Sequence, residues 1–180
     1  MIGYIIRKIL AQFLLLASIA LTVFFGLGIG TTPDAVAAIR QLEEAPRQTV
    51  YQSRQTLKDQ HGNSWQAIAF KRVSPDGKTS LELRLVGFPG VVEIDRSKPL
   101  LLTNSIGEVL TADDNSSLIF TDLSAPEANV GEYDLQPLLA QLQPEVPLSL
   151  TLPTIGGESV QLSVPPSFVQ EWQTLSASRE

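Results

Sequence analysis

Hydrophobic and polar residues alternate along much of the chain beyond residue 48, with the period of two that indicates half-buried β-strands. Residues 80–86 show this most clearly, because three leucines alternate there with Glu82 and Arg84. The same pattern predicts further strands over residues 49–57, 65–73, 100–104, 108–111, 148–152 and 159–164.

Turn residues separate these strands at short intervals. Ser74-Pro75-Asp76-Gly77 is the strongest signal, because proline fixes φ and glycine accepts a positive φ. The three strands between residues 49 and 86 therefore predict an antiparallel meander. Short strands joined by turns that contain glycine and proline predict a mainly β fold, which is either an antiparallel β-sandwich or a barrel.

One or two short helices are expected within this β pattern. Leucines at positions 135, 138, 139 and 142 have helical spacing, and Asp134 precedes them as an N-cap. Ser167 and Gln170 have the spacing of a capping box and predict a short helix through Trp172. Residues 38–48 are polar and contain a proline, so a leader or short helix is expected there, ahead of a single β domain at 49–180.

The N-terminus has the features of an export signal. Arg7 and Lys8 precede an almost entirely apolar stretch over residues 9–29, and Ala35-Val36-Ala37 forms an A-x-A cleavage site. Residues 1–37 are therefore expected to be a signal peptide that is cleaved after Ala37. An uncleaved transmembrane anchor over residues 10–29 is the alternative, because about 20 apolar residues suffice to cross a bilayer. In both cases the basic pair directs the domain across the membrane.

Composition argues against several kinds of chemistry. The chain has no cysteine and one histidine, His61, so it cannot build a zinc site of the usual composition. Its net charge of −6 disfavours binding to nucleic acid. The oxygen-rich run Asp113-Asp114-Asn115-Ser116-Ser117 lacks the spacing of an EF-hand loop and is interpreted as an acidic surface loop. We expect no cofactor, no metal site and no catalytic residue.

The least ordinary stretch follows the strand at 80–86. Gly87-Phe88-Pro89-Gly90 predicts a tight bend that displays Phe88 at the rim of the sheet, with Arg84 as a charge available for pairing. Aromatic residues and arginine are common anchors of protein interfaces. The structural alternative is that the aromatic side chains fold into the core. The expected docking surface consists of Arg84, Phe88, Pro89, Tyr133 and Trp172.

The run Leu83-Arg84-Leu85-Val86-Gly87-Phe88-Pro89-Gly90 and the shorter stretches Asn129-Val130-Gly131-Glu132-Tyr133-Asp134-Leu135 and Val164-Pro165-Pro166 are also the basis of a resemblance. Together with residues 39–46, 51–54, 65–66 and 171–172, they resemble an uncharacterised family of exported cyanobacterial proteins. This resemblance implies the periplasm or the thylakoid lumen as the compartment. It implies no activity, because the family is a domain of unknown function.

Three classes of function follow from these observations. The first is a non-enzymatic accessory protein that docks on a membrane complex, such as a photosynthetic one, from the lumenal or periplasmic side. The second is a small barrel or sandwich that binds an apolar ligand such as a lipid or pigment in a cavity lined by Trp65, Phe70, Leu81 and Leu83. The third is a hydrolase that uses two carboxylates.

Overall fold

The computed structural model describes residues 39–45, 48–120 and 126–178. The signal-peptide and anchor predictions concern residues 1–37, which lie outside these ranges. Among the residues described, no helix has both the length and the hydropathy that a membrane span requires.

A five-stranded antiparallel sheet, ordered β1-β2-β3-β4-β7, contains the predicted meander. Its strands are β2 (Gln48–Lys58), β3 (Ser64–Val73) and β4 (Thr79–Val86), and each begins and ends within one residue of its prediction. The connecting turns place Gly62 and Gly77 at φ values of 83° and 79°. Glycine adopts this left-handed conformation without steric cost, which explains why the turns occur there.

The two outer strands of this sheet were not predicted. They are β1 (Arg40–Ala45) and β7 (Val130–Asp134), so residues 40–45 form a strand rather than the expected leader or short helix. Both strands lie at an edge, where one side has no strand partner within the sheet. A short edge strand needs little apolar surface, and its sequence therefore carries a weak alternation signal.

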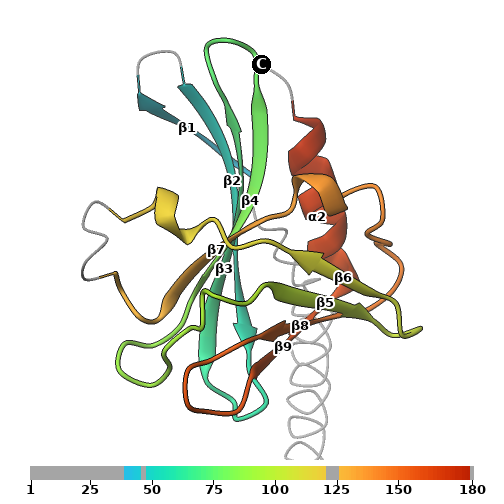
Figure 1. The fold of residues 1–180 in the computed structure, drawn as a ribbon. Helices are drawn as coiled ribbons and strands as arrows, with labels where there is room; N and C mark the ends of the chain where they lie inside the picture. Colours follow the sequence, from blue (N-terminus) through green and yellow to red (C-terminus); the bar gives the residue numbers. More distant parts are fainter. Residues whose placement is uncertain (1–38, 46–47, 121–125, 179–180) are drawn as a thin grey trace, which may run out of the picture. The chain divides into compact units, whose positions relative to one another are not determined.

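A second antiparallel sheet has four strands in the order β6-β5-β8-β9. The strands β5 (Leu100–Asn104), β6 (Val109–Ala112), β8 (Leu148–Leu152) and β9 (Val160–Val164) match the two predicted pairs. The central pairing joins β5 to β8, with Leu102 opposite Leu150. Figure 1 shows these four strands crossing the long strands of the first sheet at a steep angle.

The helices differ from their predictions in length. The leucine stripe at 135–142 forms only the 3-10 helix η2 (Gln136–Leu138), although Asp134 does accept a hydrogen bond from the Gln136 amide at 2.9 Å. The C-terminal helix α2 (Pro166–Ala177) is longer than expected and has no side-chain cap, so the capping-box prediction is wrong. Its first turn contains proline, whose missing N–H would have no partner there in any case. A further 3-10 helix, η1 (Ser116–Leu118), follows β6.

The core lies between the inner face of the five-stranded sheet, the four-stranded sheet and α2. Within the described residues both sheets stay open, so the fold resembles a sandwich and the barrel alternative is wrong. Trp65, Leu81 and Leu83 belong to this core, whereas Phe70 lies in a separate apolar cluster on the opposite face of the sheet. These four residues therefore cannot line one interior cavity.

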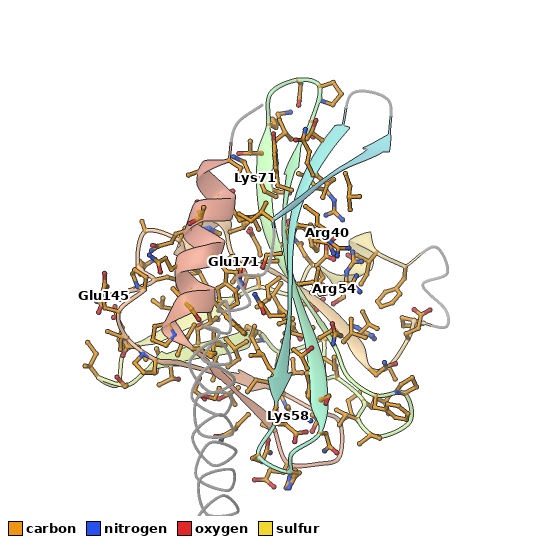
Figure 2. The ribbon with its side chains drawn as sticks, turned by 180° about the vertical axis from the view of Figure 1, so that it is seen from behind. Arg40, Arg54, Lys58, Lys71, Glu145 and Glu171 are labelled. Atoms are coloured by element: carbon orange, nitrogen blue, oxygen red, sulfur yellow. The ribbon has the colours of Figure 1, made fainter. Side chains whose placement is uncertain are left out.

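Polar side chains on the inner face of the five-stranded sheet form hydrogen bonds with α2. Lys71 on β3 is buried, and its ammonium group donates hydrogen bonds to the carbonyls of Ser176 and Ser178 at 2.6 and 2.7 Å. A cation suits the last turn of a helix because of the helix dipole. Gln55 on β2 donates to the Glu171 carboxylate at 2.6 Å. Figure 2 shows Lys71 and Glu171 on the α2 side of the sheet.

One edge of each sheet is covered by a neighbouring loop. Gln60, in the β2–β3 turn, donates to the Ser159 carbonyl and accepts from the Gln161 amide, so it closes the free edge of β9. Residues 113–116 run beside β7, with an isolated bridge between Asp114 and Tyr133. An unpaired edge strand can pair with another chain, and these loops remove two such edges.

Candidate functional site

The five predicted docking residues do not form one surface. Tyr133 and Trp172 are 0% and 1% exposed, and both belong to the core, so they cannot contact a partner of the folded domain. Burial raises the pKa of the Tyr133 hydroxyl above its ordinary value. Phe88 is 71% exposed, and Pro89 beside it is also exposed. Arg84 lies apart from them on the outer face of β4, opposite Glu132.

The loop that carries Phe88 is fixed at its base. Asn129 accepts a hydrogen bond from the Gly87 amide at 2.9 Å through its carbonyl, and its side chain donates to the Gly87 carbonyl at 2.8 Å. A Cβ atom at Gly87 would lie 2.7 Å from the Trp65 ring, so only glycine allows this close approach. Phe88 therefore projects from a rigid support rather than folding back into the core.

A second loop lies against the far end of the Phe88 loop. Ile94 forms an isolated bridge with Thr154, and the Ile155 amide donates to the Glu93 carbonyl at 2.8 Å. Val91 and Ile155 are each 56% exposed. These two loops together present three exposed apolar side chains, which we call the apolar tip: Phe88, Val91 and Ile155.

The face of the five-stranded sheet that points away from α2 holds a groove of about 350 Å³. Strands β1 to β4 supply its lining, which is Leu42, Val50, Gln52, Arg54, Ile68, Phe70, Arg72 and Arg84. Figure 2 shows Arg54 and Arg40 on this side of the sheet, opposite to Lys71 and Glu171. We call this feature the outer groove.

A buried carboxylate organises one side of the outer groove. Glu132 on β7 is 0% exposed, and its carboxylate pairs with Arg84 at 2.7 Å and with Arg72 at 3.5 Å. Both guanidinium groups lie over the Phe70 ring, at 4.3 Å for Arg72 and 5.1 Å for Arg84. The aromatic ring attracts the cations through its quadrupole, so both arginines are held in place from two directions.

Glu82 is the second buried acid on this face, and it has a weaker partner. Burial raises the pKa of its carboxyl group, and the long hydrogen bonds from Asn115, at 3.3 and 3.5 Å, offset this only in part. Neither Glu82 nor Glu132 lines the outer groove. Among the described residues, the lining of the groove therefore contains no pair of facing carboxylates of the kind that glycoside hydrolysis uses.

The remaining chemical candidates have structural roles in the described residues. His61 is exposed in the β2–β3 turn, with Glu158 3.8 Å away. Asp114 accepts hydrogen bonds from the amide and hydroxyl of Ser116, whose oxygen in turn accepts from the Glu132 amide. No group of three potential metal ligands occurs in the part of the chain that the structure describes.

The outer groove was missed in the sequence analysis, although its signals were present. The alternation in residues 49–57 places Val50, Gln52 and Arg54 on one face, and the alternation in residues 80–86 places Arg84 on the face opposite to the leucines. What the sequence lacked was the register: Arg54 is opposite Ile68, which is opposite Arg84 on the next strand. Only this pairing brings the arginines to one groove.

In a comparison with protein families, the family described as "Protein of unknown function (DUF3122)" matches residues 37–175. No curated protein and no solved structure matches the chain.

Proposed function

We propose that this chain, which belongs to the DUF3122 family, is a non-enzymatic docking module that uses the apolar tip to contact a membrane protein complex. The observation that carries the proposal is Phe88, an aromatic side chain that is 71% exposed on a loop fixed at its base. Exposing a large apolar side chain on a rigid support gives nothing to the stability of the domain, but it suits an interface anchor.

The partner is a protein surface with an apolar pocket at its centre. Interface anchors are commonly aromatic residues that fill such pockets, and surrounding aliphatic contacts exclude water. Val91, whose amide donates to the Phe88 carbonyl, and Ile155, whose amide donates to the Glu93 carbonyl, would supply those contacts. Because the supporting loops already hold the tip in one conformation, docking would require little ordering of the chain.

The N-terminal sequence supports a proposal for where this function takes place. We propose that residues 1–37 export the domain to the periplasm or thylakoid lumen of a cyanobacterium, where it is released after Ala37 or stays anchored by residues 10–29. Its partner would then be a membrane complex reached from that side, such as a photosynthetic one. The apolar segment and the A-x-A site support this proposal.

The experiment is purification of the C-terminally tagged full chain from detergent-solubilised native membranes, with mass spectrometry of the bait and its partners. Phe88→Ala should lower the affinity for the partner by about 30-fold, as expected when an interface anchor worth about 2 kcal/mol is lost. Ile106→Ala is the matched control, because Ile106 is also 71% exposed but lies in the β5–β6 turn.

Two outcomes would contradict the proposal. One is a triple variant with alanine at the three positions of the apolar tip that folds and still retains its partners in wild-type amounts. The other is a bait that is recovered without any stoichiometric partner. Circular dichroism of each variant shows whether the fold is intact.

A further inference from the structure

The outer groove concentrates positive charge on an acidic protein. The chain carries a net charge of −6, yet the groove is lined by Arg54, Arg72 and Arg84, and no acidic residue belongs to its lining. Glu132 behind it neutralises one positive charge through its ion pairs. Glu82 lies on the same face and adds negative charge near Arg72 and Asp134, so Arg54 is the positive charge that an anion would complement.

Arg54 is the guanidinium that is free to bind. In the described part of the chain it makes no hydrogen bond or ion pair, and its side chain is exposed. Strand pairing places Arg54 and Arg84 on either side of Ile68, two strands apart. Adjacent strands are about 4.8 Å apart, so the backbones of Arg54 and Arg84 are about 10 Å apart, and both side chains line the outer groove.

Arg84 keeps donors for a ligand despite its ion pair. Its Nε and Nη2 atoms contact the same oxygen of Glu132, at 2.8 and 2.7 Å. A guanidinium group has donors on more than one edge, so the Nη1 edge stays available. Glu132 and the Phe70 ring hold Arg84 in position, and little side-chain entropy is therefore lost when an anion binds.

The rest of the groove is apolar. Val50, Ile68 and Phe70 form its floor, and Leu42 on the edge strand β1 is 49% exposed at its side. A volume of about 350 Å³ lies within the range of small-molecule sites, which combine an apolar lining with a few polar groups. A free inorganic anion would leave this apolar surface unused.

We propose that the outer groove binds a small amphipathic oxyanion, with its carboxylate or phosphate between Arg54 and Arg84 and its apolar body against Leu42 and the groove floor. This proposal is independent of docking through the apolar tip, because the two sites share no residue. It relocates ligand binding from the interior of a barrel to the outer face of an open sheet.

The test is a titration of the purified full chain with 4-phenylbutyrate, in which saturation-transfer NMR detects binding. Acetate supplies the carboxylate alone, and 4-phenylbutan-1-ol supplies the apolar body alone. We expect 4-phenylbutyrate to bind at least tenfold more tightly than either. Equal binding of acetate or of the alcohol would overturn the proposal, since the site would then recognise charge only or apolar surface only.

A variant pair locates the site. Arg54→Gln should weaken binding of 4-phenylbutyrate about tenfold, because it removes a charged hydrogen-bond donor. Lys78→Gln removes an exposed cation in the β3–β4 turn and should leave binding unchanged. Partition of the probe into detergent is the same for all variants and cancels in the comparison. Unchanged binding in Arg54→Gln would refute the assignment.

The oxyanion is identified in a final titration with 4-phenylbutyl phosphate. Tighter binding than that of 4-phenylbutyrate indicates a phosphate ligand such as a lipid headgroup, whereas weaker or equal binding indicates a carboxylate such as a fatty acid. Binding of neither probe by the folded wild-type chain overturns the proposal, and it would leave the docking function untouched.

Discussion

The two faces of the five-stranded sheet are built from the same strands and have different chemistry. The inner face places Trp65, Leu81 and Leu83 in the core, and its charged residue Lys71 is used to hold the end of α2. The outer face has a small apolar cluster around Phe70, with arginines above it and a fully buried glutamate beside it. Alternate residues along each strand thus belong to two unrelated environments.

The residues of the two faces contribute differently to the stability of the domain. Apolar burial on the inner face is favourable in itself, by about 25 cal/mol for each Å² removed from water. A buried ion pair such as that of Glu132 and Arg84 gains little overall, because both groups lose their hydration. Polar residues on the outer face are usual for an antiparallel sheet with one face packed on the core and one in water. The buried glutamate between two arginines is the less usual feature, and the proposed oxyanion site gives it a role.

The largest effect is expected on the inner face, from Trp65→Ala. This change removes a side chain that is 1% exposed and takes away one of the hydrogen-bond donors to the Asp59 carboxylate. It should lower the free energy of unfolding by about 4 kcal/mol. Urea unfolding followed by the fluorescence of Trp172 measures it, with Trp65→Phe as the milder control. A loss below about 1 kcal/mol would mean that this face is not the core.

A smaller effect is expected on the outer face, from Glu132→Ala. The substitution leaves Arg72 and Arg84 without their shared carboxylate, but their side chains are 22% and 31% exposed, so water replaces part of the interaction. We expect a loss of about 2 kcal/mol in the free energy of unfolding. A double-mutant cycle with Arg84→Ala isolates the pair. If the losses of the two single variants add up to that of the double variant, Glu132 and Arg84 are not energetically coupled. The outer face would then not contain the stabilising charged network that distinguishes it from the inner face.

The smallest effect is a dependence on pH, which Glu82→Gln should remove. Because burial raises the pKa of Glu82 in the folded state, folding is favoured by the protonated form. The wild-type chain should lose this contribution as the pH rises above 4.5, the ordinary pKa of glutamic acid, and through the higher folded value. Urea unfolding at several pH values should show Glu82→Gln gaining stability relative to wild type as the pH rises. A difference in stability between Glu82→Gln and wild type that does not change with pH would contradict this prediction.

The strands with a clear alternation were predictable, including the edge strands β6 and β9, whereas the edge strands β1 and β7 were not. Residues 80–86 alternate because their leucines are buried and their polar residues point outward. In β1 the residues Arg40, Gln41 and Leu42 are all exposed, so no alternation marks that strand. The leucine stripe at 135–142 reflects burial of Leu135, Leu138 and Leu142, but a 3-10 turn achieves this as well as a helix.

The candidate sites were also predictable only where local sequence determines them. The Gly-Phe-Pro-Gly bend is predictable, but the sequence leaves open whether Phe88 is displayed or folds back into the core, and the structure leaves it exposed. Tyr133 and Trp172 were assigned to the docking surface on residue type alone, and tertiary packing buries both. The outer groove depends on the order and register of β2, β3 and β4, which come from pairing between residues distant in sequence. Local patterns contain no information about that pairing.

The covered edges of β7 and β9 have a consequence for behaviour at high concentration. A fibre can grow by strand addition when each copy both accepts and offers a strand. The side-chain amide of Gln60 occupies the β9 edge with the two hydrogen bonds of a peptide group, and residues 113–116 occupy that of β7. Among the described residues, β1 and β6 are the edges without such a cover, so strand addition by another copy is expected at these two strands.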